Sequence, residues 1–418
     1  MRIAIIGAGL GGLCLAQGLR RAGLQVTIYE RDPSAAARPQ GYRISIDPRG
    51  GRALRACLPD RLFALFEATS GQPSLGVALF VRDGQTLAEV ASIRFGEGSA
   101  PGAPSPGVVA PGRAVDRLLL RETLLAGLED AVWFGKEFTR YDLRGAEVVA
   151  HFADGTEAAS DVLVGADGVG SRVRQQVFPE VRLLDTSTRW LGGRTVLDPR
   201  LRALLPNAVE DRAVSVRDRD AVWFLAPVFF DRPPSEVASE VWPGLQFTDN
   251  EDFLMWALIG HGQFSFRDDQ LFGGPQETLH ELALQAAASA HPAIRTLVEA
   301  AAPDRAFSLA IRAVPPVDPW PERRVTFVGD AIHASPVNGT GANAALEDAA
   351  LLCRHLTSAG RKLEDALAAY QRDLLDRMRA ARAGFAAARE RMSGGVGGFT
   401  SGGPAVRPVA ARGKADPG

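Results

Sequence analysis

Apolar and polar residues along the first thirty positions follow the order strand, helix, strand. An apolar run at 2–6 (RIAII) is followed by a glycine-rich turn, by apolar residues at helical spacing over 10–23 (LGGLCLAQGLRRAG), and by a second apolar run at 26–30 (VTIYE). Short apolar runs bounded by glycine are typical of buried strands, whereas apolar positions three and four apart are typical of a helix packed on a sheet. The pattern therefore predicts a βαβ unit at the start of the chain.

The chain from 49 to 180 mixes helical and strand patterns. Residue spacing predicts a helical stretch at 49–69, two strands around an Asp-Gly turn within 76–95, and a helix over 115–128. A loop rich in Gly, Pro, Ser and Ala separates the hairpin from that helix at 96–112. Short strands are expected from 131 to 164, with a turn at Asp154 and Gly155.

Residues 181–320 differ from the part before them. They hold most of the tryptophans, many phenylalanines, and a strand-like alternation at 245–266, which together predict a second, sheet-based domain. A further strand at 323–330 leads into a long helix from about 341, and alanine-rich helices are expected over 361–392. The tail from 393 is of low complexity and is expected to be flexible.

Composition narrows the class of protein. The 418 residues suffice for two domains, or for one large domain with an inserted sheet. The chain is 46% apolar and 23% charged, as soluble globular proteins are, and its formal charge of −2 provides no basic field for nucleic acid. Three cysteines without zinc-ligand spacing favour a reducing cytoplasm and no metal site. No apolar stretch is long enough for a membrane span, and the oligomeric state stays open.

The first chemical motif is IIGAGLGG, which places Gly7, Gly9 and Gly12 in G-x-G-x-x-G spacing between strand and helix. Gly7 permits the tight turn, Gly9 lets the backbone approach a pyrophosphate, and Gly12 allows the helix to pack closely on the strand. Glu30 ends the second strand, where an acid can hydrogen-bond a ribose diol. The alternative is a plain glycine-rich turn, but the context favours dinucleotide binding, without choosing between FAD and NAD.

The second motif is DVLVGADGVGSRVRQQVFP at 161–179, where an apolar strand leads to Asp167 and Gly168 and then to a helix that opens with Ser171, Arg172 and Arg174. An acid and two arginines at the end of a strand could bind a polar ligand. They could equally cap the helix that follows, and the motif alone favours this simpler explanation.

The third motif is GDAIHASPVNGTGAN at 329–343. A buried strand stops at Gly329, so that Asp330 is the first polar residue at the strand's carboxyl end, where ligands of open α/β sheets bind. The next helix begins with Gly341, Ala342 and Asn343, whose small side chains would let backbone N–H groups meet a flat or anionic ligand. The alternative is a loop that only caps the helix.

These three motifs, in this order, resemble the flavoprotein monooxygenases of the para-hydroxybenzoate hydroxylase type, also called group A flavin hydroxylases. The resemblance implies an α/β fold in which a Rossmann-like FAD-binding domain, a parallel sheet with helices, is interrupted by a β-sheet substrate domain and followed by C-terminal helices. It implies the following division: FAD-binding domain at 1–72, 99–180 and, with the C-terminal helices, 321–392; substrate-domain hairpin at 73–98; β-sheet substrate domain at 181–320; flexible tail at 393–418.

The resemblance also implies which residues hold FAD. Glu30 would bind the adenosine ribose, Asp330 the ribityl chain, and the backbone of 339–343 the pyrimidine edge of the flavin ring. Arg174 is the best match to the family's arginine after Asp-Gly, and Arg113 matches an arginine that contacts FAD in relatives. The expected set is Gly7, Gly9, Leu10, Gly12, Glu30, Arg31, Arg113, Asp167, Arg174, Gly329, Asp330, Pro336, Gly339, Gly341, Ala342 and Asn343.

Two positions depart from the family's pattern. Gly170 stands where a histidine often follows Asp-Gly, and GDAIH replaces the commoner GDAAH. The NADH or NADPH that would reduce FAD is therefore less firmly implied than FAD itself.

The resemblance implies that NADH or NADPH reduces FAD and that O2 forms a C4a-hydroperoxide, which hydroxylates a small aromatic or polyketide-like molecule. Pro336, Val337 and the aromatic residues of 190–264 are expected as apolar walls. No catalytic base is evident: Pro336 and His333 are the candidates, and a lone histidine such as His333 or His261 is more often a structural hydrogen-bonder. Arg43, Arg194 and Arg212 could bind an acidic substrate.

Three other functions compete with hydroxylation. The same cofactor could insert oxygen beside a ketone, in a Baeyer-Villiger reaction. It could instead be structural, in a cyclase without redox chemistry. The fold could also have lost flavin and bind proteins, as the GDP-dissociation inhibitors do. Intact Gly7, Gly9, Glu30 and Asp330 argue against this last function.

Overall fold

The computed structural model describes residues 1–35, 37, 42–83, 86–94, 112–218, 221–261, 266–321, 323–335, 341–395 and 407–408, with side chains omitted for 261, 384–395 and 407–408. The strands are β1 Arg2–Ile6, β2 Gln25–Tyr29, β3 Arg43–Ile46, β4 Pro73–Ser74, β5 Gly76–Asp83, β6 Thr86–Arg94, β7 Gly112–Asp116, β8 Val132–Trp133, β9 Phe138–Arg144, β10 Glu147–Phe152, β11 Glu157–Ser160, β12 Val162–Gly165, β13 Leu184–Val196, β14 Ala213–Asp218, β15 Ala221–Val228, β16 Phe253–His261, β17 Phe307–Ala313, β18 Val325–Phe327 and β19 Arg407–Pro408. The helices are α1 Leu10–Arg21, α2 Pro48–Cys57, α3 Asp60–Ala68, α4 Arg117–Leu125, α5 Arg172–Val177, α6 Pro199–Arg202, α7 Pro234–Val241, α8 Asp268–Phe272, α9 Gln276–Ala287, α10 Pro292–Glu299, α11 Asp330–His333, α12 Gly341–Leu356 and α13 Leu363–Gly395, with short 3-10 turns at Asn207–Glu210 and Pro303–Arg305.

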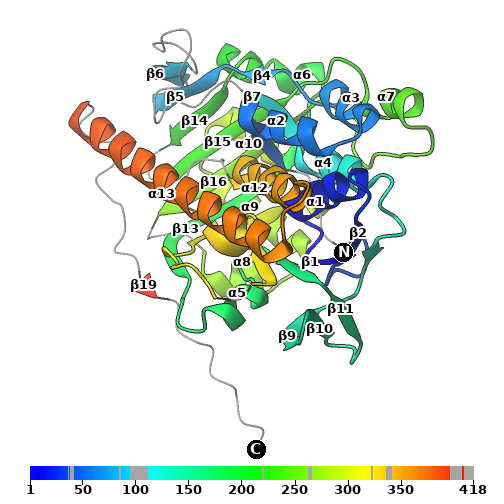
Figure 1. The fold of residues 1–418 in the computed structure, drawn as a ribbon. Coiled ribbons are helices and arrows are strands. Elements are labelled where there is room, and N and C mark those ends of the chain that lie inside the picture. The colour runs from blue at the N-terminus through cyan, green and yellow to red at the C-terminus, as the bar shows by residue number, and fades with distance from the viewer. Residues whose placement is uncertain are drawn as a thin grey trace, which may run out of the picture.

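A parallel sheet carries the N-terminal motif. Its strand order is β18-β12-β1-β2-β8, and each neighbouring pair is parallel. Helices α1 and α12 pack against each other beside this sheet (Figure 1). Because parallel strands are covered on their faces, β1 and β12 are apolar almost throughout. The predicted βαβ unit is thereby confirmed.

A second, larger sheet contains the aromatic part of the chain. Its order is β17-β13-β16-β15-β14-β5-β6. The short strand β19, near the C-terminal end of the sequence, also pairs with β13. The predicted hairpin of β5 and β6 joins this sheet through parallel pairing of β5 with β14, although residue 84 of its Asp-Gly turn lies outside the described residues. Helices α9 and α10 cover one face, so residues 181–320 contain more helix than the sequence predicted.

A small sheet of β3, β7 and β4 joins these two layers. One of its faces contributes Ile44, Ile46 and Val115 to the N-terminal core, while Ala114 on the other face packs among residues of the large sheet. Strands β3 and β7 both contact β15. This small sheet therefore connects the parallel sheet and its helices to the large sheet.

The C-terminal region is a single long helix, α13, rather than the several alanine-rich helices predicted (Figure 1). It is fixed to the parallel sheet by Tyr370, whose buried hydroxyl donates to the Phe327 carbonyl at 2.6 Å. Most of the predicted flexible tail falls outside the described residues. Of the described residues in the strand-like pattern predicted for 245–266, which leave out 262–265, Phe253–His261 form a strand and 245–252 do not.

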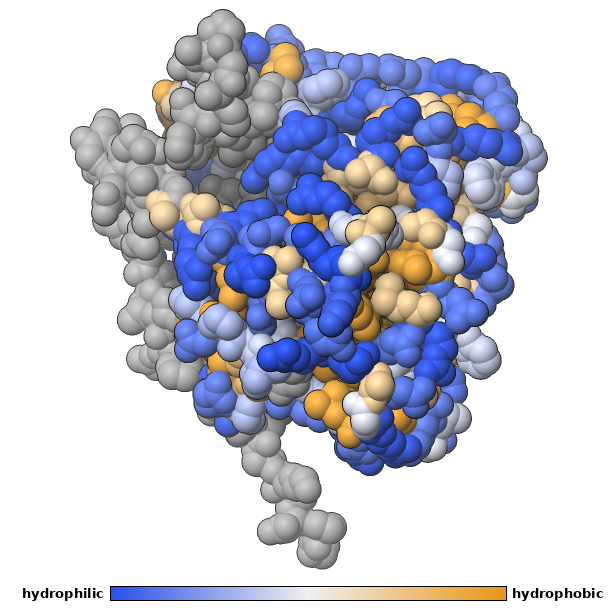
Figure 2. Space-filling view, viewed as in Figure 1, coloured by the Kyte–Doolittle hydropathy of each residue, from blue (hydrophilic) through white to orange (hydrophobic). Residues whose placement is uncertain are grey.

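Hydrophilic residues cover most of the face shown in Figure 2, with apolar residues in small groups between them. In the described part of the chain no helix combines the length and apolar character that crossing a membrane requires.

Candidate functional site

A cavity of about 220 Å³ opens at the carboxyl ends of β1 and β2. Both the first and the second motif reach it, because its lining includes Gly7, Gly9, Glu30, Asp167 and Gly168. Ligands of open α/β sheets bind at this end of the strands. The structure thus brings together residues that are more than 130 positions apart in the sequence.

The three fingerprint glycines have separate physical roles. Gly7 has φ of 108°, and a Cβ atom there would lie 2.5 Å from the Ala166 carbonyl oxygen. A Cβ atom at Gly12 would lie 2.3 Å from the Gly7 oxygen, whereas one at Gly9 would meet nothing within 4 Å. Gly7 and Gly12 are therefore required by the fold, and Gly9 leaves open space before the first residue of α1, Leu10, where no side chain caps the helix.

Glu30 is held at the edge of this cavity by two backbone hydrogen bonds. Its buried carboxylate accepts from the Ala8 N–H at 2.8 Å and from the Asp32 N–H at 3.0 Å. Each oxygen keeps a further lone pair for a ribose hydroxyl. Arg31 also lines the cavity and is exposed.

Arg117, which the sequence analysis missed, lines the cavity in place of Arg113. The Arg113 side chain is 41% exposed and turns toward Glu67. In contrast, Arg117 begins α4, its guanidinium lies 5.4 Å from the Tyr42 ring centre, and its buried Nη1 atom has no hydrogen-bond partner among the described residues. Arg113 lies in β7 and Arg117, four positions later, begins α4, and the sequence pattern alone could not decide which of the two faces the cavity.

We expect Arg117→Met to weaken FAD binding by roughly tenfold to a hundredfold, because a charge-assisted hydrogen bond to a phosphate contributes about 1.5–3 kcal/mol. Arg113→Met is the matched control and should leave the dissociation constant unchanged. Titration of FAD into cofactor-free protein, followed by flavin fluorescence, measures both. Equal losses in the two variants would contradict the assignment.

The second motif caps the helix that follows it and also reaches the cavity. The Asp167 carboxylate caps α5 by accepting from the Arg172 N–H at 2.7 Å and the Val173 N–H at 3.3 Å. Its other oxygen, Oδ1, is buried without a hydrogen-bond partner among the described residues, and burial raises the pKa of this carboxyl. Asp167 therefore both caps the helix and leaves an acceptor beside the cavity.

Arg174 joins the second motif to the third. Its buried guanidinium donates to the Ala331 carbonyl at 2.6 Å and to the Val169 carbonyl at 2.7 Å. The cavity lining does not include it. The structure therefore supports a positioning role for Arg174 in place of the direct FAD contact that the resemblance implied.

The third motif turns sharply at Gly329, whose φ of 65° is unfavourable for residues with a side chain. Asp330 is exposed and begins the short helix α11. Asp348 of α12, a second residue that the sequence analysis missed, fixes this turn by accepting from the Gly329 N–H at 2.7 Å and from His333 Nε2. The sequence signal for Asp348 is an acid on the buried face of an apolar helix.

His333 has a structural environment. Burial lowers the pKa of its imidazole to about 4, so that the ring is neutral near pH 7, and its Nε2 is engaged by Asp348. These contacts favour the structural role over the catalytic one. The other catalytic candidate, Pro336, lies outside the described residues, as do Val337 and Gly339.

Helix α12 begins at Gly341, as predicted. A Cβ atom on Gly341 would approach only the Asp330 Oδ1 atom, at 3.5 Å. The Asn343 side chain is buried, where its Oδ1 accepts from the Asp47 N–H at 2.9 Å and its Nδ2 donates to the Ser45 carbonyl at 2.8 Å. Asn343 thus fixes the start of α12 against β3, which leaves only its backbone for a ligand.

Two of the three arginines predicted to bind an acidic substrate are already paired. Arg194 of β13 donates to Asp116 at 2.6 Å and to Asp249 at 2.5 Å. Arg212 pairs with Asp211 at 2.9 Å and with Glu89 at 3.1 Å. The structure therefore contradicts this role for Arg194 and Arg212, because their guanidinium groups already have carboxylate partners.

Glu122 of α4 lies near the carboxylates of this network, and burial raises its pKa from the ordinary value of 4.5 to about 7. A carboxyl with a raised pKa in the folded state stabilises the protein fully below pH 4.5, and this contribution is lost as the pH rises through 7. Glu122→Gln can keep a hydrogen bond to Thr248. We expect this variant to lose less stability than wild type when the pH is raised from 5 to 8. Thermal unfolding of both proteins at pH 5 and at pH 8 measures the loss. The same change in melting temperature in variant and wild type would contradict the prediction.

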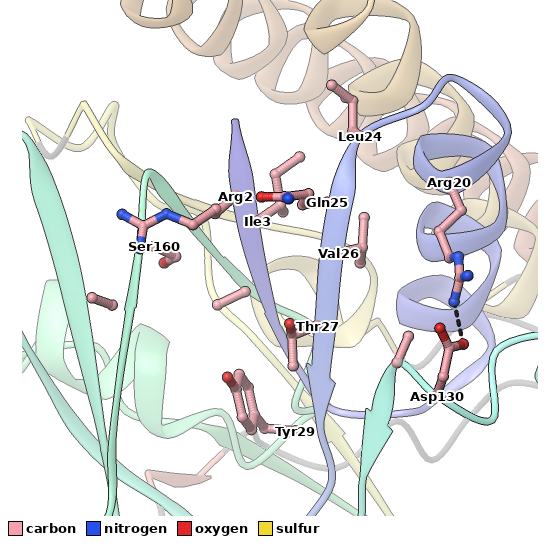
Figure 3. A pocket seen from close by; sticks show the side chains of 13 residues that line it. Arg2, Ile3, Arg20, Leu24, Gln25, Val26, Thr27, Tyr29, Asp130 and Ser160 are labelled. Atoms are coloured by element: carbon pink, nitrogen blue, oxygen red, sulfur yellow. Dashed lines mark hydrogen bonds and ion pairs between the residues drawn. The ribbon is translucent and has the colours of Figure 1, made fainter.

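Another cavity, of about 400 Å³, starts at Arg2 and Gln25, the first residues of β1 and β2 (Figure 3). Arg20 on its border is paired with Asp130 (Figure 3). This cavity is larger than the one at Gly9, but none of the fingerprint glycines Gly7, Gly9 and Gly12 lines it. We therefore assign no cofactor to this cavity. Among the residues that the structure describes, no group of His, Cys, Asp and Glu could hold a metal ion.

The cavity at Gly9 fits a dinucleotide by its own geometry. It combines open space at an uncapped helix start, a buried acid at the end of β2, and a guanidinium nitrogen without a partner among the described residues. A pyrophosphate and a ribose would satisfy these groups. The site and the parallel sheet together define an α/β dinucleotide-binding protein.

The chain belongs to the FAD binding domain family, whose model matches residues 1–228 and 267–384 and which includes the para-hydroxybenzoate hydroxylase-like proteins. The predicted family, the α/β fold class and the FAD cofactor are thereby confirmed.

Named relatives come from fungi and bacteria. A dual O-methyltransferase/FAD-dependent monooxygenase of Phaeosphaeria nodorum is 34% identical over 397 residues, which cover 87% of this chain and 41% of that protein. A 6-hydroxynicotinate 3-monooxygenase of Pseudomonas fluorescens is 29% identical over 382 residues, covering 90% and 88%. A solved structure from Photorhabdus luminescens, assigned as an FAD-containing monooxygenase, has a TM-score of 0.73 at 29% identity and covers 94% and 98%. The chain spans about two fifths of the length of the fungal relatives.

Proposed function

We propose that the protein is an FAD-dependent monooxygenase that uses NADH or NADPH and O2 to hydroxylate a small aromatic or polyketide-like molecule. The observation that carries this proposal is the cavity at Gly9, with Glu30 and Arg117 facing it. Membership of the FAD binding domain family and similarity to enzymes named as monooxygenases support it. A cytoplasmic location, expected from three free cysteines, belongs to the same proposal.

The residues around the cavity would hold FAD in a defined way. Gly9 and the start of α1 would receive the pyrophosphate, Glu30 the ribose, and Arg117 a phosphate charge. The first backbone N–H groups of α12, from Gly341 onward, have no partner within the helix and would stabilise negative charge on a bound ring. When bound, FAD supplies the redox chemistry, accepting hydride from the nicotinamide and activating O2.

The division of the chain into domains belongs to this proposal as well. The parallel sheet and its helices would form the FAD-binding part, and the large sheet, with the β5–β6 hairpin, the part that covers the substrate. The pairing of β5 with β14 supports assigning 73–98 to the same domain as 181–320.

The proposal is tested by purifying the protein and measuring flavin absorbance, NADH and NADPH oxidation, and O2 consumption with a panel of aromatic compounds. We expect yellow protein, and faster nicotinamide oxidation with at least one compound, which gains one oxygen atom. Colourless protein that does not take up FAD would contradict the proposal. An ester product would indicate Baeyer-Villiger chemistry instead, and product formed without O2 would indicate a cyclase.

A further inference from the structure

The three cysteines of the chain, Cys14, Cys57 and Cys353, meet in the structure although they are far apart in the sequence. They come from α1, α2 and α12, three helices that pack against one another (Figure 1). The Cys57 thiol is hydrogen-bonded to both of the other two. The bond with Cys14, together with burial, raises the pKa of Cys57, and the bond with Cys57 raises the pKa of Cys353.

Gly18 of α1 lets two of the sulfur atoms come close to each other. A Cβ atom on Gly18 would lie 2.9 Å from the Cys353 Sγ atom and 3.1 Å from the Cys57 Sγ atom. Because both distances start from one point, their sum, 6.0 Å, is the greatest separation that these two sulfur atoms can have. A glycine inside a helix lowers the stability of that helix. Here the space that it leaves is filled by the two thiols.

Helices α2 and α12 run side by side in the same direction. Near their starts, the Asn343 side chain of α12 accepts from the backbone N–H of Asp47, the N-cap of α2. Ten residues further along each helix, Cys353 meets Cys57. Ten helical residues span about 15 Å, and the lining of the cavity at Gly9 includes no cysteine. A bond between these thiols would therefore join distant parts of the chain without entering the cavity.

Solvent reaches this pair of thiols through Cys353. Cys14 and Cys57 are fully buried, whereas Cys353 is partly exposed. The guanidinium of Arg21, an exposed residue, donates to backbone carbonyl groups on either side of Cys57 and favours the thiolate of both Cys57 and Cys353. Because the pKa values of both are nevertheless raised, the reactive thiolate is scarce near pH 7. A small neutral oxidant can thus react with Cys353, but only during prolonged exposure.

We propose that Cys57 and Cys353 form a disulfide when the protein is exposed to hydrogen peroxide, and that this bond reversibly joins α2 to α12. Peroxide transfers one oxygen atom to the Cys353 sulfur, which breaks the O–O bond and releases one water. The Cys57 sulfur then attacks the oxidised sulfur, which forms the S–S bond and releases a second water. Two thiols are thereby oxidised by two electrons in total, and one peroxide is reduced. Small thiols can reduce the bond again, as they do for disulfides in reducing compartments.

The first test identifies the bond. Reduced, folded protein is treated with hydrogen peroxide until no further change occurs, the remaining thiols are alkylated in denaturant, and the mass and the linked peptides are measured. We expect the protein to lose two hydrogen atoms and to keep one free thiol, with a peptide that links Cys57 to Cys353. Cys14→Ala is the matched control and should form the same bond, whereas Cys57→Ala and Cys353→Ala should form none.

Three results would overturn the proposal: three free thiols after the treatment, a linked peptide that contains Cys14 or joins two molecules, and sulfinic or sulfonic acid at Cys353 in place of the link. Each of them is read from the wild-type protein, so the test stays decisive even if a variant does not fold. It also needs no turnover, so its outcome is independent of the proposed function.

The second test measures what the bond does to the fold. Residues 57 and 353 are almost 300 positions apart, and closing so long a segment restricts the unfolded chain. We expect oxidised wild type to melt about 3 °C or more above reduced wild type, and to return to the lower temperature after reduction with dithiothreitol. Cys14→Ala should show the same shift, and Cys353→Ala none. An unchanged or lower melting temperature in oxidised wild type would show that the bond does not hold α2 to α12, and would overturn the proposal.

Discussion

Replacing Gly9 with leucine is expected to abolish FAD binding while the protein stays folded. A Cβ atom at this position meets no protein atom within 4 Å, so the fold has room for the side chain. The leucine would occupy the space at the start of α1, where a pyrophosphate must approach the backbone. We expect affinity to fall about a hundredfold or more, which corresponds to about 2.8 kcal/mol. Flavin absorbance after FAD loading and thermal unfolding of the cofactor-free protein measure the two effects.

Two other glycines provide controls for this experiment. Gly51 of α2 also has no atom within 4 Å of its Cβ position, so Gly51→Leu should keep both FAD and stability. Gly12→Leu should lose both, because its Cβ would lie 2.3 Å from the Gly7 oxygen. A Gly9→Leu protein that stays yellow would refute the assignment of the pyrophosphate site. Gly341, whose Cβ position meets only Asp330, should behave as Gly9 does.

Replacing Asp348 with alanine is expected to destabilise the protein by about 3–5 kcal/mol, the usual cost of breaking a buried ion pair. Asp348 is fully buried and accepts from Gly329 and His333 while pairing with Arg377. Its removal leaves the Gly329 N–H without its acceptor and leaves Arg377 with only the longer ion pair to Glu347. Urea unfolding of the cofactor-free protein measures the loss, and FAD affinity should fall in parallel because the turn that carries Asp330 is no longer fixed.

The neighbouring acid, Glu347, is a matched control for Asp348. Its side chain is 25% exposed, and its ion pairs with Arg377 and Arg49 are longer, at 3.5 and 3.9 Å. Glu347→Ala should therefore cost only about 0–1 kcal/mol. If the two alanine variants unfolded at the same urea concentration, Asp348 would not be the anchor of the turn.

The sequence was sufficient to predict those parts of the site in which the backbone itself dictates the residue type. Gly7, Gly12 and Gly329 are glycines because of positive φ angles or approaches that no side chain permits, and such requirements leave local signatures. The order of strands and helices around them followed from apolar spacing. The strand at β1 and the helix from Gly341 were predicted for these reasons.

The parts that the sequence could not predict depend on contacts between distant segments. Arg117 and Arg113 are equally plausible in the sequence, and only the burial of the α4 start against Tyr42 separates them. Arg174 was expected to contact FAD, but its guanidinium donates to the Ala331 carbonyl of α11 and to the Val169 carbonyl. The length of α13 was missed because alanine-rich sequence carries no signal for where one helix ends and another begins.

The two hydrogen bonds of Asn343 have a consequence for how the protein is made. They join the start of α12 to Ser45 and Asp47, which lie 298 and 296 positions earlier in the chain. A ribosome that adds about 5–20 residues per second needs roughly 15–60 s to travel between these positions. During that interval the glycine-rich half of the nucleotide site is already outside the ribosome, but its other half does not exist. FAD can therefore stabilise the protein only late in synthesis, and until then the nascent N-terminal unit depends on its own core or on chaperones.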